Sequence, residues 1–256
     1  MIRIASIDNI SAQAFRLHAP DFPAVVDLMS PAKTFRAIES GHYEAALLPT
    51  ACLPSLRGKI ETLGAFGIAC TGPVSSVRLY CKKPLSQILS TRAPLFVSAK
   101  SKTSLRLLSV LCQMEYGQFP TLTPDPSQAL GRLYIGEDAY TVSAEERAWP
   151  EVIDMGAWWH AKTGLPFVFA TWVARIGLSP HDRNNLLGWL RTNTIQAESQ
   201  TGRRALGSRH LSAMTSRAFA QSYYKRIRTR LTPIDFLAMR RFLALTQEYL
   251  PCSLSA

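Results

Sequence analysis

The amino-acid sequence predicts an α/β fold built from two lobes. Short apolar strands alternate with capped helices, which is the order that forms parallel sheets. Strand-like segments cluster before about residue 90 and again in the middle of the chain, and helices dominate its end. We therefore expect a first lobe from residues 1–90 plus 173–256 and a second lobe from residues 91–172. Ligands of such sheets bind beyond the carboxyl ends of the strands, here in a cleft between the lobes.

The first elements follow from local patterns. Ile2–Ile7 alternates like a strand, and Val25–Leu28 is a second strand-like segment. Ser30 precedes a proline, which is typical of a helix N-cap followed by its first residue. Gly41 predicts the end of that helix. Ala45–Leu48 is an apolar run typical of a buried parallel strand.

The same alternation continues through the rest of the chain. Further strands are predicted at Val77–Cys81, Leu95–Ser98, Leu133–Gly136 and Phe167–Val173. Helices are predicted from Leu105 to Cys112, around Trp158–His160, and from Pro180 to the end with breaks near Gly202 and Thr232. The segment from Thr121 to Ser127 is rich in proline and threonine and predicts a loop.

Composition favours a globular protein that stays in the cytoplasm. Hydrophobic residues make up 47% and charged residues 18% of the 256 residues, which suits a sizeable core. No apolar run reaches the ~18 residues that a membrane span needs. The N-terminus enters a strand pattern at once, without the charged segment, apolar core and cleavage site of a secretory signal.

The cysteines predict no disulfide framework and no zinc site. There are five, an odd number, and none are in CxxC spacing: Cys52, Cys70, Cys81, Cys112 and Cys252. We expect reduced, mostly buried thiols.

The net charge of +11 suits an anionic partner. The most basic stretch, Tyr223–Arg230, combines arginines with aromatic residues, a pattern that can mark RNA binding. A solvated helix face also explains this pattern, and we favour that interpretation. We accordingly predict no nucleic-acid partner.

Common catalytic motifs are missing from the sequence. It has no GxSxG, HExxH, GxGxxG or GxxxxGK[ST] pattern. Its five histidines lack metal-ligand spacing. Serine hydrolysis, metal hydrolysis and nucleotide binding therefore have no support.

Three polar segments lie where predicted strands end or begin. Ser101–Ser104 joins a strand to a helix, and a helix N-terminus binds carboxylate or phosphate well. Ser76 precedes a strand, and Asn9 follows the first one. Each segment also has a local explanation, which is N-capping for the first and a turn for the others. Together they point to a ligand site at the edge of the proposed cleft.

One long segment resembles a known family. Asp154–Trp172 is similar to the "DLG…W…TGLPFVFA.W" signature of the menaquinone-pathway chorismate dehydratases. Shorter matches follow in the expected order along nearly the whole chain. They are Gly41–Pro49 with "G..D.ALIP", Val74–Leu79 with "V.SV.L", Ser101–Ser104 with "S.TS", Ile135–Ala139 with "IGD.A", and Tyr223–Tyr224 with Leu231–Phe242 at the C-terminal end.

The resemblance implies a fold, a reaction and roles for the polar segments. The fold is that of the type II periplasmic binding proteins, without export. The reaction is loss of water from chorismate to give 3-(1-carboxyvinyloxy)benzoate, the first step of the futalosine route, and no cofactor is used. Asn9 and Ser76 would be catalytic. Ser101, Thr103, Ser104 and Gly136 would bind the substrate, a small dicarboxylate. We expect a monomer or homodimer without a membrane partner.

Two other functions remain open. The family usually has "YLN..PL" after its first strand, whereas Ile7–Gln13 has an asparagine without that tyrosine and proline. A non-catalytic binding protein for an aromatic or cyclic carboxylate fits the same scaffold. The sister enzyme, which makes 1,4-dihydroxy-6-naphthoate, is the second alternative. That branch carries "HEG" where this chain has Ile135–Glu137, and it uses the histidine as a base, which Gly136 cannot do.

Overall fold

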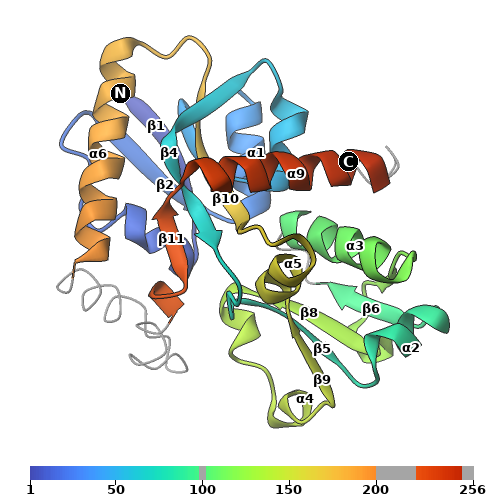
Figure 1. The fold of residues 1–256 in the computed structure, drawn as a ribbon. Coiled ribbons are helices and arrows are strands. Elements are labelled where there is room, and N and C mark those ends of the chain that lie inside the picture. The colour runs from blue at the N-terminus through green and yellow to red at the C-terminus, as the bar shows by residue number, and fades with distance from the viewer. Residues whose placement is uncertain (98–101, 200–222, 250–256) are drawn as a thin grey trace. The chain divides into compact units, whose positions relative to one another are not determined.

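The computed structural model describes residues 1–97, 102–199 and 223–249. The chain forms two compact units, each described here by itself. The first contains Met1–Ala69 and Val168–Pro233, and the second contains Cys70–Phe167 and the chain from Ile234 onward. Figure 1 shows the elements of both units along the chain.

The first unit is built on a six-stranded sheet with the order β11-β4-β10-β3-β1-β2. Its strands are β1 (Ile2–Ile7), β2 (Ala24–Met29), β3 (Ala45–Pro49), β4 (Ile60–Cys70), β10 (Phe167–Arg175) and β11 (Ile227–Arg230). β1 runs parallel to β2 and β3, and β10 runs antiparallel to β3. The carboxyl ends of β1, β2 and β3 therefore share one edge.

Helices cover both faces of this sheet. One face holds α1 (Pro31–Glu39) and the short helix η2 (Thr50–Leu56), whose Ile38 and Leu56 join one buried cluster. The other face holds α6 (Pro180–Glu198) and η1 (Ile10–Phe15). There the ring of Trp172 packs edge-on against Phe15 and Trp189, with centroids 5.7 and 5.8 Å apart. The result is a three-layer α/β/α unit.

The second unit has a five-stranded sheet with the order β7-β6-β8-β5-β9. Its strands are β5 (Val77–Cys81), β6 (Pro94–Val97), β7 (Thr121–Thr123), β8 (Gly131–Ile135) and β9 (Glu151–Asp154). β5 is antiparallel to β8 and β9, whereas β6 is parallel to β7 and β8.

The helices of the second unit are α2 (Leu85–Ser90), α3 (Lys102–Tyr116), α4 (Ala144–Arg147), α5 (Met155–Thr163) and α9 (Pro233–Tyr249), with η3 (Pro126–Gln128) and η4 (Gly136–Ala139) in its loops. α3 and α5 lie side by side on one face of the sheet (Figure 1). Phe242 of α9 packs on Trp159 of α5 and on Phe167, with ring centroids 6.0 and 4.9 Å apart.

The prediction of an α/β fold with two sheets is confirmed, but the assignment of elements to lobes needs correction. β5 was expected in the first lobe, yet it pairs with β8 and β9 in the second sheet. The predicted C-terminal helices also divide differently. α9 groups with the second unit because its Phe242 packs on Trp159.

Two local predictions were wrong. The basic stretch Tyr223–Arg230 contains strand β11 where a helix face was expected. Its Ile227 and Thr229 are buried while Arg230 is exposed, so the period is that of a strand. The predicted loop after Thr121 opens with β7, which pairs with β6. In both cases pairing with a distant strand overrides local propensity.

Four of the five cysteines fit their prediction. Cys52, Cys70, Cys81 and Cys112 are free and buried, and Cys252 lies outside the described residues. No helix in the described ranges is long and apolar enough to cross a membrane.

Candidate functional site

One edge of the five-stranded sheet collects most of the predicted site residues. Val77, the first residue of β5, pairs with Ile135, the last residue of β8. β6 ends beside β8, and Asp154 at the end of β9 pairs with Arg78. The segments that carry Ser76, Gly136, the start of α3 and the start of α5 therefore meet at this edge.

Backbone contacts join the two loops that flank β5 and β8. The N–H of Gly136 donates to the carbonyl oxygen of Ser76 at 2.7 Å. Gly136 has φ +68°, a left-handed conformation that favours glycine. This N–H is thus engaged within the protein, and the glycine holds the loop of Ser76 in place.

The predicted hydroxyl residues are buried. Ser76 exposes 4% of its surface, and Thr103 and Ser104 in the first turn of α3 expose 1% each. Ser101 lies outside the described residues. A ligand that binds these hydroxyls must displace the groups that cover them. The first turn of a helix also offers backbone N–H groups to an anion.

Asp154 organises this edge, although it was not predicted as a site residue. Its Oδ1 accepts hydrogen bonds from the N–H groups of Gly156 and Ala157 at 3.0 and 3.1 Å, which caps α5. The same oxygen accepts from the N–H of Val74 at 3.0 Å, and Oδ2 accepts from the N–H of Ser75 at 2.6 Å. One carboxylate therefore holds both the helix start and the loop before β5.

Asn9 belongs to the first unit, at the carboxyl end of β1. Its Oδ1 accepts a hydrogen bond from the N–H of Ala12 at 3.0 Å and caps η1. Its Nδ2 group is the donor left for a ligand. Two tyrosines fix η1: Tyr223 shares a 2.5 Å hydrogen bond with the hydroxyl of Ser11, and Tyr224 donates to the carbonyl of Ile10 at 2.5 Å.

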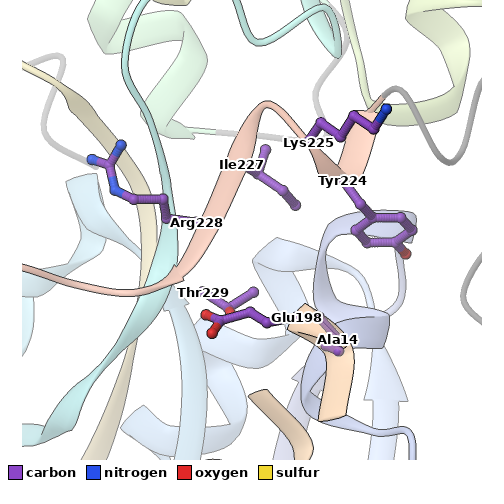
Figure 2. Close-up of a pocket in the computed structure, with 8 residues that line it drawn as sticks. Ala14, Glu198, Tyr224, Lys225, Ile227, Arg228 and Thr229 are labelled. Atoms are coloured by element: carbon purple, nitrogen blue, oxygen red, sulfur yellow. The ribbon is translucent and has the colours of Figure 1, made fainter. Parts of the chain in front are cut away.

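The first unit also contains a pocket of about 290 Å³ (Figure 2). It is lined by Ala14, Ala197, Glu198, Tyr224, Lys225, Ile227, Arg228 and Thr229. None of these was predicted as a site residue. Five of them lie in Tyr223–Arg230, which was expected to be a solvated helix face. Burial raises the pKa of the Tyr224 phenol above its usual range, so this group stays a neutral donor to the Ile10 carbonyl.

A buried acid anchors the segment that follows Gly136. Glu146 accepts hydrogen bonds from Arg132 at 2.6 Å and Tyr134 at 2.5 Å, and it closes a capping box with Ser143. Burial raises the pKa of Glu146, but these hydrogen bonds outweigh that effect and hold its pKa below the ordinary value. The cluster stabilises the loop between β8 and β9.

Among residues 1–97, 102–199 and 223–249, no group of three or more histidine, cysteine or acidic side chains could hold a metal ion. The segments described at this edge carry hydroxyl and backbone N–H groups, which are the donor types that suit a small anion.

The chain matches the family model described as menaquinone biosynthesis over residues 13–248. The chain belongs to that family. The resemblance found in the sequence is thereby confirmed, and the long Asp154–Trp172 segment lies within the matched range.

Solved structures similar to this menaquinone-biosynthesis family member share its fold. Protein AF1704 from Archaeoglobus fulgidus is 16% identical with a TM-score of 0.69, covering 96% of this chain and 97% of its own. The CA3427 gene product of Candida albicans, described as having the generic periplasmic binding protein fold, is 9% identical with a TM-score of 0.61, covering 100% and 93%. A putative sulfonate-binding protein from Methylobacillus flagellatus is 12% identical with a TM-score of 0.64, covering 97% and 87%. These similarities confirm the predicted periplasmic-binding-protein-like fold.

Sequence reasoning on this family member missed Asp154. The signal was present, since an acidic residue directly before a helix is a common N-cap. Local sequence patterns could not predict that the same carboxylate accepts hydrogen bonds from Val74 and Ser75, about eighty residues earlier in the chain.

Proposed function

We propose that this protein dehydrates chorismate to 3-(1-carboxyvinyloxy)benzoate and is therefore a hydro-lyase of menaquinone biosynthesis. The observation that carries the proposal is the shared sheet edge. It brings Ser76, Gly136 and the first turn of α3 together in a chain that belongs to the menaquinone-biosynthesis family.

The chemistry asks little of the protein beyond binding and orientation. A ring C–H bond and the neighbouring C–O bond to the hydroxyl break, and the C–H electron pair becomes a ring double bond. The hydroxyl leaves as water, with the proton that a base removed from carbon. Because the product ring is aromatic, the step is strongly downhill. Holding a dianion in one orientation and assisting proton transfer supply the catalysis.

In this proposal residues of the second unit bind the two carboxylates of chorismate. Hydroxyls of Ser101, Thr103 and Ser104 and N–H groups of the α3 start bind one carboxylate, and Ser76 binds or orients the other. Asn9 donates from Nδ2 near the departing hydroxyl, since its Oδ1 already caps η1. The substrate's own enolpyruvyl carboxylate serves as the base.

The proposal is tested by incubating purified protein with chorismate and following the aromatic product by liquid chromatography and mass spectrometry. We expect a product one water lighter than chorismate, formed much faster than in a protein-free control. Ser76→Ala should slow its formation. Chorismate consumption no faster than in that control would refute the proposal.

A second candidate is a non-catalytic binding protein for a cyclic carboxylate. It is favoured by the fold neighbours, one of which is described as a periplasmic sulfonate-binding protein. Calorimetric binding of chorismate without turnover would support it. A 1,4-dihydroxy-6-naphthoate synthase activity has less support, because Ile135–Glu137 contains no histidine where that branch carries its catalytic one.

A further inference from the structure

The loop before β5 contains a non-glycine residue with a left-handed backbone conformation. Ser75 has φ +67°, a left-handed conformation that is unfavourable for a residue with a Cβ atom. Its N–H donates to Asp154 Oδ2 at 2.6 Å, the shortest of the four backbone hydrogen bonds to that carboxylate. The carboxylate thus stabilises the strained residue directly before Ser76.

The loop also lies in close contact with the first turn of α5. A Cβ atom at Gly156 would lie 2.6 Å from the carbonyl oxygen of Gly72 and 2.8 Å from Cys70 Sγ. Cys70 Sγ in turn donates to the Gly72 carbonyl at 3.3 Å. Only a residue without a side chain at position 156 permits this approach.

Ser76 is therefore fixed from two sides. Its N-terminal neighbour Ser75 is bound by Asp154, and its own carbonyl oxygen accepts the N–H of Gly136. Arg78 of β5, two residues after Ser76, has its Nε 4.0 Å from Asp154 Oδ2. Asp154 is thus the charged side chain to which the Val74 and Ser75 N–H groups donate.

We propose that Asp154 is a positioning residue that presets Ser76 for the substrate carboxylate. It does so by holding the Val74–Ser75 backbone against the start of α5. The substrate part of this inference rests on the proposed function. Because Asp154 already occupies the Gly156 and Ala157 N–H groups, these donors at the start of α5 are not available to the substrate carboxylate.

The geometry permits variants that separate the two tasks of Asp154. In Asp154→Asn, the amide oxygen can replace Oδ1 and keep the bonds from Val74, Gly156 and Ala157, while the amide nitrogen then faces the N–H of Ser75. Two donors meet there, so the Ser75 bond is lost selectively. Asp154→Ser keeps a helix cap but is too short to reach the loop.

A matched control comes from another capped helix. Ser179 caps α6 by accepting the N–H of Asp182 at 3.0 Å, and it belongs to the first unit, whereas the loop of Ser76 belongs to the second. Ser179→Ala removes a helix cap without touching this loop. It shows how much turnover falls when only stability is reduced.

The experiment combines amide hydrogen exchange of the ligand-free protein, measured by NMR, with steady-state turnover of chorismate. In Asp154→Asn we expect Ser75 to exchange about tenfold faster while Val74 changes little, because only the charge-assisted bond to Ser75 is lost. The value of kcat/KM should fall about tenfold. Asp154→Ser should accelerate exchange at both residues, and Ser179→Ala should change none of these quantities appreciably.

A rescue variant separates positioning from general stability. Adding Ser75→Gly to Asp154→Asn removes the penalty on the left-handed backbone, so a several-fold recovery of kcat/KM is expected. Unchanged Ser75 exchange, or kcat/KM in Asp154→Asn equal to that of Ser179→Ala, would overturn the inference. If the wild-type protein turns over no chorismate, the proposed function fails. The exchange of Ser75 and Val74 then still decides whether Asp154 sets this loop.

Discussion

Replacing Gly156 with alanine tests the contact between α5 and the loop of Ser76. The added methyl group would lie 2.6 Å from the Gly72 carbonyl oxygen, 2.8 Å from Cys70 Sγ and 3.3 Å from Val74 Cβ. The first two separations are too short for van der Waals contact. The loop or the helix start must therefore move.

The expected loss of stability follows from two opposing terms. Overpacking of this kind costs about 1–3 kcal/mol. Alanine regains roughly 0.5–1 kcal/mol over glycine inside a helix, and less near its first turn. The free energy of unfolding should thus fall by about 1–2 kcal/mol, which lowers the unfolding temperature by roughly 2–8 °C for a chain of this size.

The same substitution elsewhere provides the control. Gly188 lies within α6, and a Cβ atom there would meet nothing within 4 Å. Gly188→Ala should raise the free energy of unfolding by about 0.5–1 kcal/mol through helix propensity alone. Differential scanning calorimetry of both variants measures the two shifts. If Gly156→Ala unfolds at or above the wild-type temperature, the contact that we describe does not constrain the loop.

Three further predictions concern the Asn9 amide, the buried Glu146 carboxylate and the thiols of Cys81 and Cys112. Asn9→Ala should lower kcat for chorismate more than it raises KM, and unchanged kcat would remove Asn9 from the mechanism. Glu146→Gln should lower the free energy of unfolding by about 1–3 kcal/mol at pH 7, because the partly buried Arg132 loses its charged partner. The folded-state pKa of Glu146 lies below its ordinary value of 4.5. The contribution of the Glu146 carboxylate to stability is therefore complete above pH 4.5 and is lost as pH falls through the folded-state pKa. Urea denaturation should accordingly give wild type and Glu146→Gln similar free energies of unfolding in acid. A stability difference between them that persists in acid would contradict this. Burial raises the pKa of Cys81 and Cys112 to about 12, so neither should react with iodoacetamide at pH 8 unless the protein is unfolded.

The sequence predicted those elements whose signals are local. Ser30 caps α1 as expected, accepting the N–H of Lys33 at 3.4 Å, and Gly41 follows the helix with φ +77°. The apolar run at β3 became a buried central strand. Each of these depends on a few neighbouring residues, which is why pattern and capping rules sufficed.

The candidate site was predicted in part. Ser76, Gly136 and the start of α3 lie on segments that share one sheet edge, as their positions at predicted strand ends suggested. The hydrogen bonds that fix this edge were not foreseen. They connect Asp154 to Val74 and Ser75, and the distance along the chain hides such pairing from any local pattern.

By itself, the sequence determined the α/β class, the family and most strand and helix positions, since periodicity, caps and motif spacing are carried by adjacent residues. Only the tertiary structure decided that β5 belongs to the second sheet, that the basic stretch ends in strand β11, and that one carboxylate sets the loop of Ser76. The physical reason is that strand partners and buried hydrogen-bond acceptors are chosen by long-range packing, where burial and pairing outweigh local propensity.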